Sequence, residues 1–360
     1  MEPDAIKIKV IGIGNAGLNI CESLIERQNT NIEIYAADTD KNKLNKTKIT
    51  NKIILGTSLN GSGTGGDPKL GAQAAEESSE QIAQIIDDCN MLIIVSGFGG
   101  GTGTGASETI AKLARNKNIL TLAIITLPMA DIVGKRKLEL ANNYLEKLTQ
   151  CVNSYMVIDN NRMLQQNAEL PMYQAVKMAN VAVETTIDVI DDIISNVSDL
   201  NIDFSDIKSA LINGGKIVVA SGKSQNGDKV TNAFEAARDS SSFIDKPTSF
   251  ATLLTNCTVD TKISYADILE LRKKIIEEYQ LPEDIDGKFG IDYKEHEDSR
   301  DDYLKFSYIL TQGNHNSSTS YIINNNMDLS QIIDDEITNA FNSYDSSDSI
   351  NKNIDKLPEF

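Results

Sequence analysis

The segment from Ser96 to Ser107 contains the residues whose chemistry is plainest in this chain. It reads SGFGGGTGTGAS, and six of the nine residues from 97 to 105 are glycine. Glycine lacks the Cβ atom that would keep a phosphate away from the backbone, so several amide N–H groups can converge on one anion. Thr102 and Thr104 can add hydroxyl donors. These residue types and their spacing predict a phosphate-binding loop.

The elements on either side of this loop favour the same interpretation. The apolar run over 91–95 predicts a buried parallel strand, and residues 108–116 predict a helix with an apolar side. A glycine loop between a strand and a helix directs the N–H groups at the helix start toward an anion. A flexible glycine linker, the alternative, does not lie between a buried strand and a helix.

Two more glycine-rich loops precede this one. Residues 12–17, GIGNAG, follow a predicted strand over 6–11, and residues 61–68, GSGTGGDP, precede a helix predicted from about 68 to 88. The GxGxxG spacing of the first loop, with acidic residues after the next predicted strand (32–37), would also suit an NAD-dependent oxidoreductase. A dinucleotide fold has one such loop, whereas three on successive strand–helix units favour a nucleoside triphosphate.

In their order along the chain, the three loops resemble the nucleotide-binding loops of the tubulin/FtsZ superfamily, whose signature is GGGTGTG, here residues 99–105. The resemblance implies a GTPase that binds GTP or GDP with Mg²⁺. Asn19, Asn160 and Asn180 are expected to recognise guanine, although Asn180 could simply be a polar residue on the exposed side of a helix. The full set of expected nucleotide contacts is Gly12, Gly14, Asn15, Asn19, Thr64, Gly65, Gly66, Gly99, Gly100, Gly101, Thr102, Gly103, Thr104, Arg136, Asn160 and Asn180.

Several residues depart from the family pattern near the nucleotide. Val133 stands where the family has a ribose-binding glutamate, and Asp131 and Arg136 are expected to substitute from shifted positions. Val176 replaces an aromatic residue near the base. Asp67 replaces an asparagine, and a carboxylate there would repel a triphosphate unless Mg²⁺ or water intervened. These changes bear on the affinity for the nucleotide.

Residues 199–207, DLNIDFSDI, resemble the synergy loop of the family at Asn201, Asp203 and Asp206. Hydrolysis of a γ-phosphate needs a positioned water and a carboxylate that orients it or shares its proton. The resemblance implies that these three residues are catalytic and act on the nucleotide of the next subunit. As an alternative, Asp206 caps or begins a helix starting near Ile207, which would explain one of the two aspartates.

Apolar residues between Met172 and Ile194 recur at steps of three and four, which predicts a helix of about 24 residues with one buried face. The expected fold class is α/β: a Rossmann-like GTPase domain with a parallel sheet, a long central helix and a smaller α+β domain. The predicted domains are 1–170 (GTP binding), 171–196 (central helix), 197–313 (activation) and 314–360 (a disordered acidic, Asn- and Ser-rich tail ending in a docking peptide, 355–360).

Composition limits the partners. The net charge of −18 argues against nucleic acid as the main partner and against unaided binding to anionic lipid, because both need a basic face. The four cysteines form no CxxC pair, and the two histidines lie late in polar surroundings, so neither a zinc signature nor a histidine triad is indicated. Without a secretory signal or a long apolar stretch, we expect a cytoplasmic protein.

The resemblance implies a GTPase that polymerises head to tail with itself, hydrolyses GTP at the subunit interface and serves cell division at the inner face of the membrane. The terminal peptide would bind a membrane-tethering adaptor. Two alternatives remain open: a tubulin-like filament that positions plasmid or phage DNA, and a degenerate nucleotide-binding regulator of a true FtsZ.

Overall fold

The computed structural model describes residues 6–25, 32–195, 202–224, 227–241, 244–259, 263–293 and 303–313. Within them the strands hydrogen-bond in the order β3-β2-β1-β4-β5-β6-β7-β10-β8-β9. The predicted tail (314–360) and its docking peptide lie outside the described residues. Among the described helices, none combines the length and the apolarity needed to cross a membrane.

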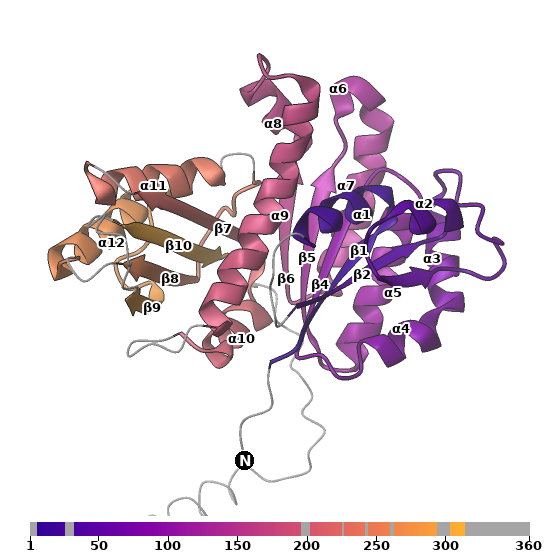
Figure 1. Cartoon of the computed structure of the whole chain (residues 1–360), viewed down its shortest axis with the longest axis horizontal. Helices are drawn as coiled ribbons and strands as arrows, with labels where there is room; N and C mark the ends of the chain where they lie inside the picture. The colour runs from indigo at the N-terminus through magenta and orange to yellow at the C-terminus, as the bar shows by residue number, and fades with distance from the viewer. Residues whose placement is uncertain are drawn as a thin grey trace, which may run out of the picture. The chain divides into compact units, whose positions relative to one another are not determined.

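Six parallel strands form the first part of this order (Figure 1). They are β1 (Ile8–Ile13), β2 (Ile32–Asp38), β3 (Asn51–Ile54), β4 (Met91–Gly97), β5 (Leu120–Leu127) and β6 (Ser154–Asp159). In β4, Ile93 and Val95 enter the core on one face, and Leu92 and Ile94 enter the core on the other. Helices cover both faces, which is why such strands are continuous apolar runs.

The helices of this part are α1 (Gly14–Leu24), α2 (Lys41–Lys46), α3 (Pro68–Glu77), α4 (Ser79–Ile85), α5 (Thr102–Asn116), α6 (Ala130–Val133), α7 (Lys135–Thr149) and α8 (Asn160–Gln166). Helix α1 contributes to the core on one face of the sheet. Helices α3, α4, α5 and α7 contribute to the core on the other face. The sheet is therefore a middle layer between two helical layers.

The predicted long helix is confirmed as α9 (Met172–Ser195), which buries Val183, Ile187 and Ile190. The remaining elements are α10 (Phe204–Ile212), β7 (Gly215–Ser224), α11 (Lys229–Ser240), β8 (Thr252–Val259), α12 (Tyr265–Tyr279), β9 (Asp286–Tyr293) and β10 (Leu304–Thr311). Strand β10 is antiparallel to β7 and β8, and β9 is parallel to β8. Only two residue pairs join β6 to β7, at Ser154 and Tyr155.

Two predicted helix boundaries are wrong. Helix α5 begins at Thr102, six residues before the predicted start, because its glycines allow close packing: a Cβ atom on Gly105 would collide with the carbonyl oxygen of Pro68 in α3. The single helix predicted over 68–88 is two helices that meet at Ser78. There the Ser78 hydroxyl accepts a hydrogen bond from the Gly56 N–H at 3.0 Å, and the Ser78 backbone leaves helical geometry.

Candidate functional site

The three glycine-rich loops meet at the carboxyl edge of the parallel sheet. Strands β1 and β4 are parallel neighbours, so the loops that follow them leave the sheet on the same side. A Cβ atom on Gly14 would lie 2.9 Å from the backbone nitrogen of Gly103, and one on Gly101 would collide with the side chain of Thr64. The first and second loops therefore both contact the third loop at a glycine, as the prediction of a single site requires.

The N-terminus of α5 presents free donors at this edge. The N–H groups of the first turn of a helix have no intrahelical partner, and Gly101 at the N-cap has no side chain to cap them. The first bond of the helix runs from the Gly105 N–H to the Gly101 carbonyl at 2.9 Å. The N–H groups of Thr102, Gly103 and Thr104 are therefore available to an anion, and their contact with phosphate stays a prediction.

The two threonine hydroxyls of this turn also shape the loop. Thr104 is fully buried, and its hydroxyl accepts a hydrogen bond from the Gly99 N–H at 3.0 Å. The Thr102 hydroxyl lies 2.7 Å from that of Thr39, which follows β2. Both hydroxyls thus have partners within the protein, and direct phosphate contacts of these two hydroxyls stay predictions.

The second loop opens a space that side chains do not fill. Gly65 and Gly66 have φ angles of +58° and +90°, and a Cβ atom built on either, or on Gly100, would meet no atom within 4 Å. Left-handed backbone favours glycine, and here it leaves room for a ligand. Asp67 has a structural role, because it caps α3 by accepting a hydrogen bond from the Lys69 N–H at 2.8 Å.

Asp38 is a member of this edge that the sequence reasoning did not single out. It is 1% exposed; its Oδ1 accepts hydrogen bonds from the Asp40 N–H at 3.0 Å and the Thr102 hydroxyl at 3.4 Å. Its Oδ2 has no hydrogen-bond partner among the described residues. A buried carboxylate oxygen beside a phosphate loop is a donor that suits Mg²⁺, so Asp38 and Thr102 fit the expected cation. An acidic residue at the carboxyl end of a strand was the signal for it.

The residues expected to contact the nucleoside come from helices that contact one another. Asn19, with the expected contact Asn15, lies exposed on α1, Asn160 begins α8 and Asn180 lies half-buried on α9; both α1 and α8 pack against α9. The Oδ1 atom of Asn160 is buried and has no hydrogen-bond partner among the described residues. A buried amide oxygen without a partner fits a ligand that brings a donor, such as a base or a sugar hydroxyl.

The residues expected to contact the ribose have fewer features that point to a ligand than those expected near the base. Arg136 is exposed in the first turn of α7, and Val133 is 41% exposed at the end of α6. The Asp131 carboxylate accepts a hydrogen bond from the Gln165 amide of α8 at 3.3 Å, and the Asp131 N–H donates to the Asn161 amide oxygen at 3.4 Å. Asp131 thus holds α6 against α8, and its substitution for the missing glutamate stays a prediction.

Asp203 and Asp206 begin α10, three residues earlier than the predicted start of that helix. Asp203 is the N-cap, and the two form a capping box: Asp203 Oδ1 accepts from the Asp206 N–H at 3.0 Å, and Asp206 Oδ2 accepts from the Asp203 N–H at 3.2 Å. The view that capping explains one aspartate is therefore wrong, because it explains both. Hydrogen bonds from the Ser205 hydroxyl and the Asp206 N–H hold the pKa of Asp203 below its usual range. Asn201 lies outside the described residues.

These aspartates lie far from the phosphate loops of their own chain. Helix α10 attaches to the amino end of β6, where the Ser154 hydroxyl donates to the Leu211 carbonyl at 2.6 Å. Helix α9 separates α8, at the loop edge, from α10 at the opposite end (Figure 1). A helix of 24 residues is about 36 Å long. The structure thus does not bring Asp203 and Asp206 together with the predicted phosphate loops within one chain.

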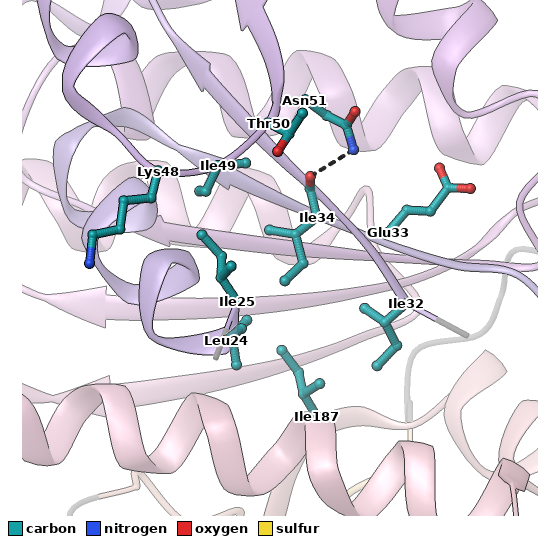
Figure 2. A pocket seen from close by; sticks show the side chains of 10 residues that line it. All are labelled: Leu24, Ile25, Ile32, Glu33, Ile34, Lys48, Ile49, Thr50, Asn51 and Ile187. Atoms are coloured by element: carbon teal, nitrogen blue, oxygen red, sulfur yellow. Dashed lines mark hydrogen bonds between the residues drawn. The ribbon is translucent and has the colours of Figure 1, made fainter. Parts of the chain in front are cut away.

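A pocket of about 310 Å³ lies elsewhere (Figure 2). The pocket has a mixed lining: apolar side chains such as Leu24 of α1, Ile32 of β2 and Ile187 of α9 lie beside polar ones, Glu33, Lys48, Thr50 and Asn51. Ile34 of β2 also lines it. Ile32 is at the amino end of β2, whereas Asp38, at the carboxyl end, belongs to the loop edge. The pocket is therefore distinct from the candidate nucleotide site.

Comparison with known proteins agrees with this geometry. The family model for the tubulin/FtsZ family, GTPase domain, matches residues 7–168, which include all three glycine loops and Asp38. Over the part that carries the three glycine loops, the chain is thus similar to the tubulin/FtsZ family. The α/β fold class expected from the sequence is confirmed.

Individual relatives of this superfamily extend the match. The chain is 35% identical over 226 residues to the cell division protein FtsZ of Mycoplasmopsis pulmonis, a match that covers 63% of this chain and 58% of that protein. It is similar to an FtsZ dimer from M. jannaschii (TM-score 0.74, 27% identity, 86% of this chain and 89% of that chain). A GTPγS-form protofilament of Bacillus thuringiensis TubZ shares the fold (TM-score 0.70, 14% identity, 96% and 95% covered). The chain spans less than two thirds of the length of the first curated FtsZ relatives it matches.

Proposed function

We propose that this chain is a GTPase that assembles head to tail and completes its active site at the subunit interface. The observation that carries the proposal is the separation of its two halves: phosphate-binding backbone at one edge of the sheet, and Asp203 and Asp206 at the start of α10 beyond the other edge. A head-to-tail contact brings opposite ends of two copies together, which is what these two half-sites require.

In the proposed reaction, the loops and the α5 N-terminus bind and orient the triphosphate, and the neighbour contributes the carboxylates. Water forms a bond to the γ-phosphorus, the bond from that phosphorus to the bridging oxygen breaks, and GDP leaves with the bonding electrons. A carboxylate of the neighbour orients the water and takes up its proton. Mg²⁺, held by Asp38 and Thr102 when bound with the nucleotide, would offset phosphate charge.

Further proposals concern the cellular role of the protein, its location and its partner. The FtsZ relatives support a role in cell division in the cytoplasm, with recruitment to the division site by an adaptor that binds the terminal peptide. Positioning of plasmid or phage DNA and regulation of a more typical FtsZ are the alternatives. The exposed Val133, where the family has a glutamate, motivates the regulator.

The test is phosphate release from GTP as a function of protein concentration, for the native chain and for Asp206→Asn. Negligible turnover below a threshold, a linear rise above it and at least a roughly 100-fold loss in the variant are expected. Asparagine keeps an oxygen for the capping box, so the variant should retain its fold. Turnover proportional to protein from the lowest concentration would show a self-contained site. GTP binding without turnover at any concentration would favour the regulator.

A further inference from the structure

Lys288 of β9 faces the predicted catalytic aspartates from another element. Its Nζ lies 3.3 Å from Oδ1 of Asp206, with the lysine side chain 53% exposed and the aspartate side chain 23% exposed. The other carboxylate oxygen of Asp206 accepts the Asp203 N–H. Both oxygens of Asp206 therefore have a donor, and the plane of the carboxylate is fixed between α10 and β9.

The backbone around Lys288 is held firmly enough to position its side chain. Lys288 pairs with Leu254 of β8, and the Thr255 hydroxyl donates to the Lys288 carbonyl at 3.2 Å. Two residues further along β9, a Cβ atom on Gly290 would lie 2.6 Å from the Asn256 side chain and 3.3 Å from Ile202. Since Ile202 is 1% exposed, this contact docks the segment before α10 directly on β9.

The charge of Lys288 can offset an electrostatic repulsion that the two aspartates would otherwise cause. If Asp203 and Asp206 approach a neighbour's triphosphate, two carboxylates meet a polyanion, and like charges at close range oppose the encounter. A lysine that contacts one of the carboxylates offsets this repulsion at the place where it arises. Lys288 also contributes to the lowered pKa of Asp203, after the larger effects of the Ser205 hydroxyl and the Asp206 N–H.

We propose that Lys288 is a positioning residue for hydrolysis in trans: it fixes the Asp206 carboxylate and carries positive charge to the face that meets the γ-phosphate of the next subunit. This inference rests on the proposed function. It names the ligand class of that face as a nucleoside triphosphate presented by another copy of the chain. The β9 edge thereby becomes part of the active site, although it lies more than 80 residues after Asp206 in sequence.

The experiment compares Lys288→Gln and Lys288→Arg in the full-length chain. The readouts are GTP turnover per assembled subunit, the critical concentration by sedimentation and the melting temperature. We expect Lys288→Gln to lower turnover roughly tenfold, a part of what a positioned acid or base contributes, with the melting temperature unchanged. Lys288→Arg, which keeps the positive charge, should retain most of the turnover of the native chain. The matched control is Lys273→Gln, which removes a more exposed lysine (74% against 53% for Lys288) that pairs with Glu277 on α12 instead.

The outcomes distinguish a failure of this inference from a failure of the proposed function on which it rests. If Asp206→Asn abolishes turnover and Lys288→Gln leaves it unchanged, the inference is wrong and the proposed function stands. The same holds if Lys273→Gln loses as much activity, if Lys288→Arg is as impaired as Lys288→Gln, or if turnover rises. If Asp206→Asn itself retains turnover, the proposed function fails first. In the Asp206→Asn background, Lys288→Gln should add no further loss, because the two residues act together.

Discussion

The loop edge and the start of α10 differ in what they leave unsatisfied. At the loop edge, oxygens of Asp38 and Asn160 are buried without partners among the described residues, and the first turn of α5 offers N–H groups to whatever binds there. At the start of α10, both aspartates are engaged in a capping box and one also in an ion pair. The first region is shaped for a ligand, whereas the second is stable without one.

This difference indicates which region depends on a partner. Groups that are buried and unsatisfied are costly, so the loop edge should gain stability when it is occupied. Exposed groups that satisfy one another gain little from any single ligand and are free to meet a second copy. The asymmetry suits the proposed subunit, which binds its nucleotide by itself and meets its carboxylate partner only on assembly.

The largest expected effect comes from placing a charge in the loop edge alone. Gly100→Asp introduces a carboxylate where a Cβ atom meets nothing within 4 Å, so the fold should survive while phosphate is repelled. GTP affinity, measured by calorimetry, should fall at least about 100-fold. Gly100→Asn, of equal size and without charge, is the control and should lose much less.

Mixing this variant with Asp206→Asn tests the comparison directly. Each should be inactive alone, but an interface with the loops of one and the carboxylates of the other is complete. Turnover should then return in the mixture. If both variants co-sediment in filaments and no turnover returns, the two regions do not form one site.

A second prediction separates ligand binding from stability at the loop edge. Asp38→Asn removes a buried negative charge, so the melting temperature of the nucleotide-free protein should rise. The apparent affinity for Mg²⁺ in the presence of GTP should fall by about tenfold, because one anionic oxygen ligand is lost. Titration of Mg²⁺ against nucleotide binding measures the second effect. A lower melting temperature with unchanged Mg²⁺ affinity would assign Asp38 a structural role only.

Much of this edge could be predicted from the sequence because its signals are local. Continuous apolar runs gave the parallel strands, and glycine spacing located the loops. The start of α5 could not be predicted in this way, because it depends on the close approach of α3, which is distant in sequence but adjacent in space. Asp38 needed the structure as well, because only burial distinguishes it from neighbouring acidic residues.

The second region was harder to predict for related reasons. Strand β9 was not predicted, because only Gly290 and Ile291 of it are buried and it has no apolar stripe. Its two glycines, Gly287 and Gly290, are typical of turns, so the local sequence does not indicate its pairing with β8. In the first half of the chain, helix α7 was missed for the same reason, since Ala141 and Leu148 are its only fully buried residues. The Asp206–Lys288 pair joins two segments whose proximity no local pattern indicates.

A smaller effect is expected from overpacking the contact between the second and third loops. A methyl group on Gly101 would collide with the Thr64 side chain, so Gly101→Ala should destabilise the fold by about 2 kcal/mol and weaken GTP binding. Gly100→Ala, one residue away in open space, is the matched control for the stability effect and should leave the free energy of unfolding unchanged. Urea unfolding and calorimetry on the pair measure both effects. Equal behaviour of the two variants would show that the loops do not contact each other as described.

The smallest expected effect on stability distinguishes the role of Asp203 as N-cap of α10 from its proposed role in hydrolysis. Asp203→Ala removes the cap and should cost about 1 kcal/mol at neutral pH, whereas Asp203→Ser keeps a good N-cap and should cost a few tenths. The folded-state pKa of Asp203 is lowered, so its stabilisation is present above the unfolded pKa and is lost as the pH falls through the folded value. The difference in the free energy of unfolding between the native chain and Asp203→Ala should therefore become smaller at acidic pH. Because serine caps the helix but carries no charge, Asp203→Ser should unfold like the native chain and yet lose turnover in filaments. If it keeps full turnover, Asp203 serves the helix alone, and the half-site at α10 reduces to Asp206 and its lysine.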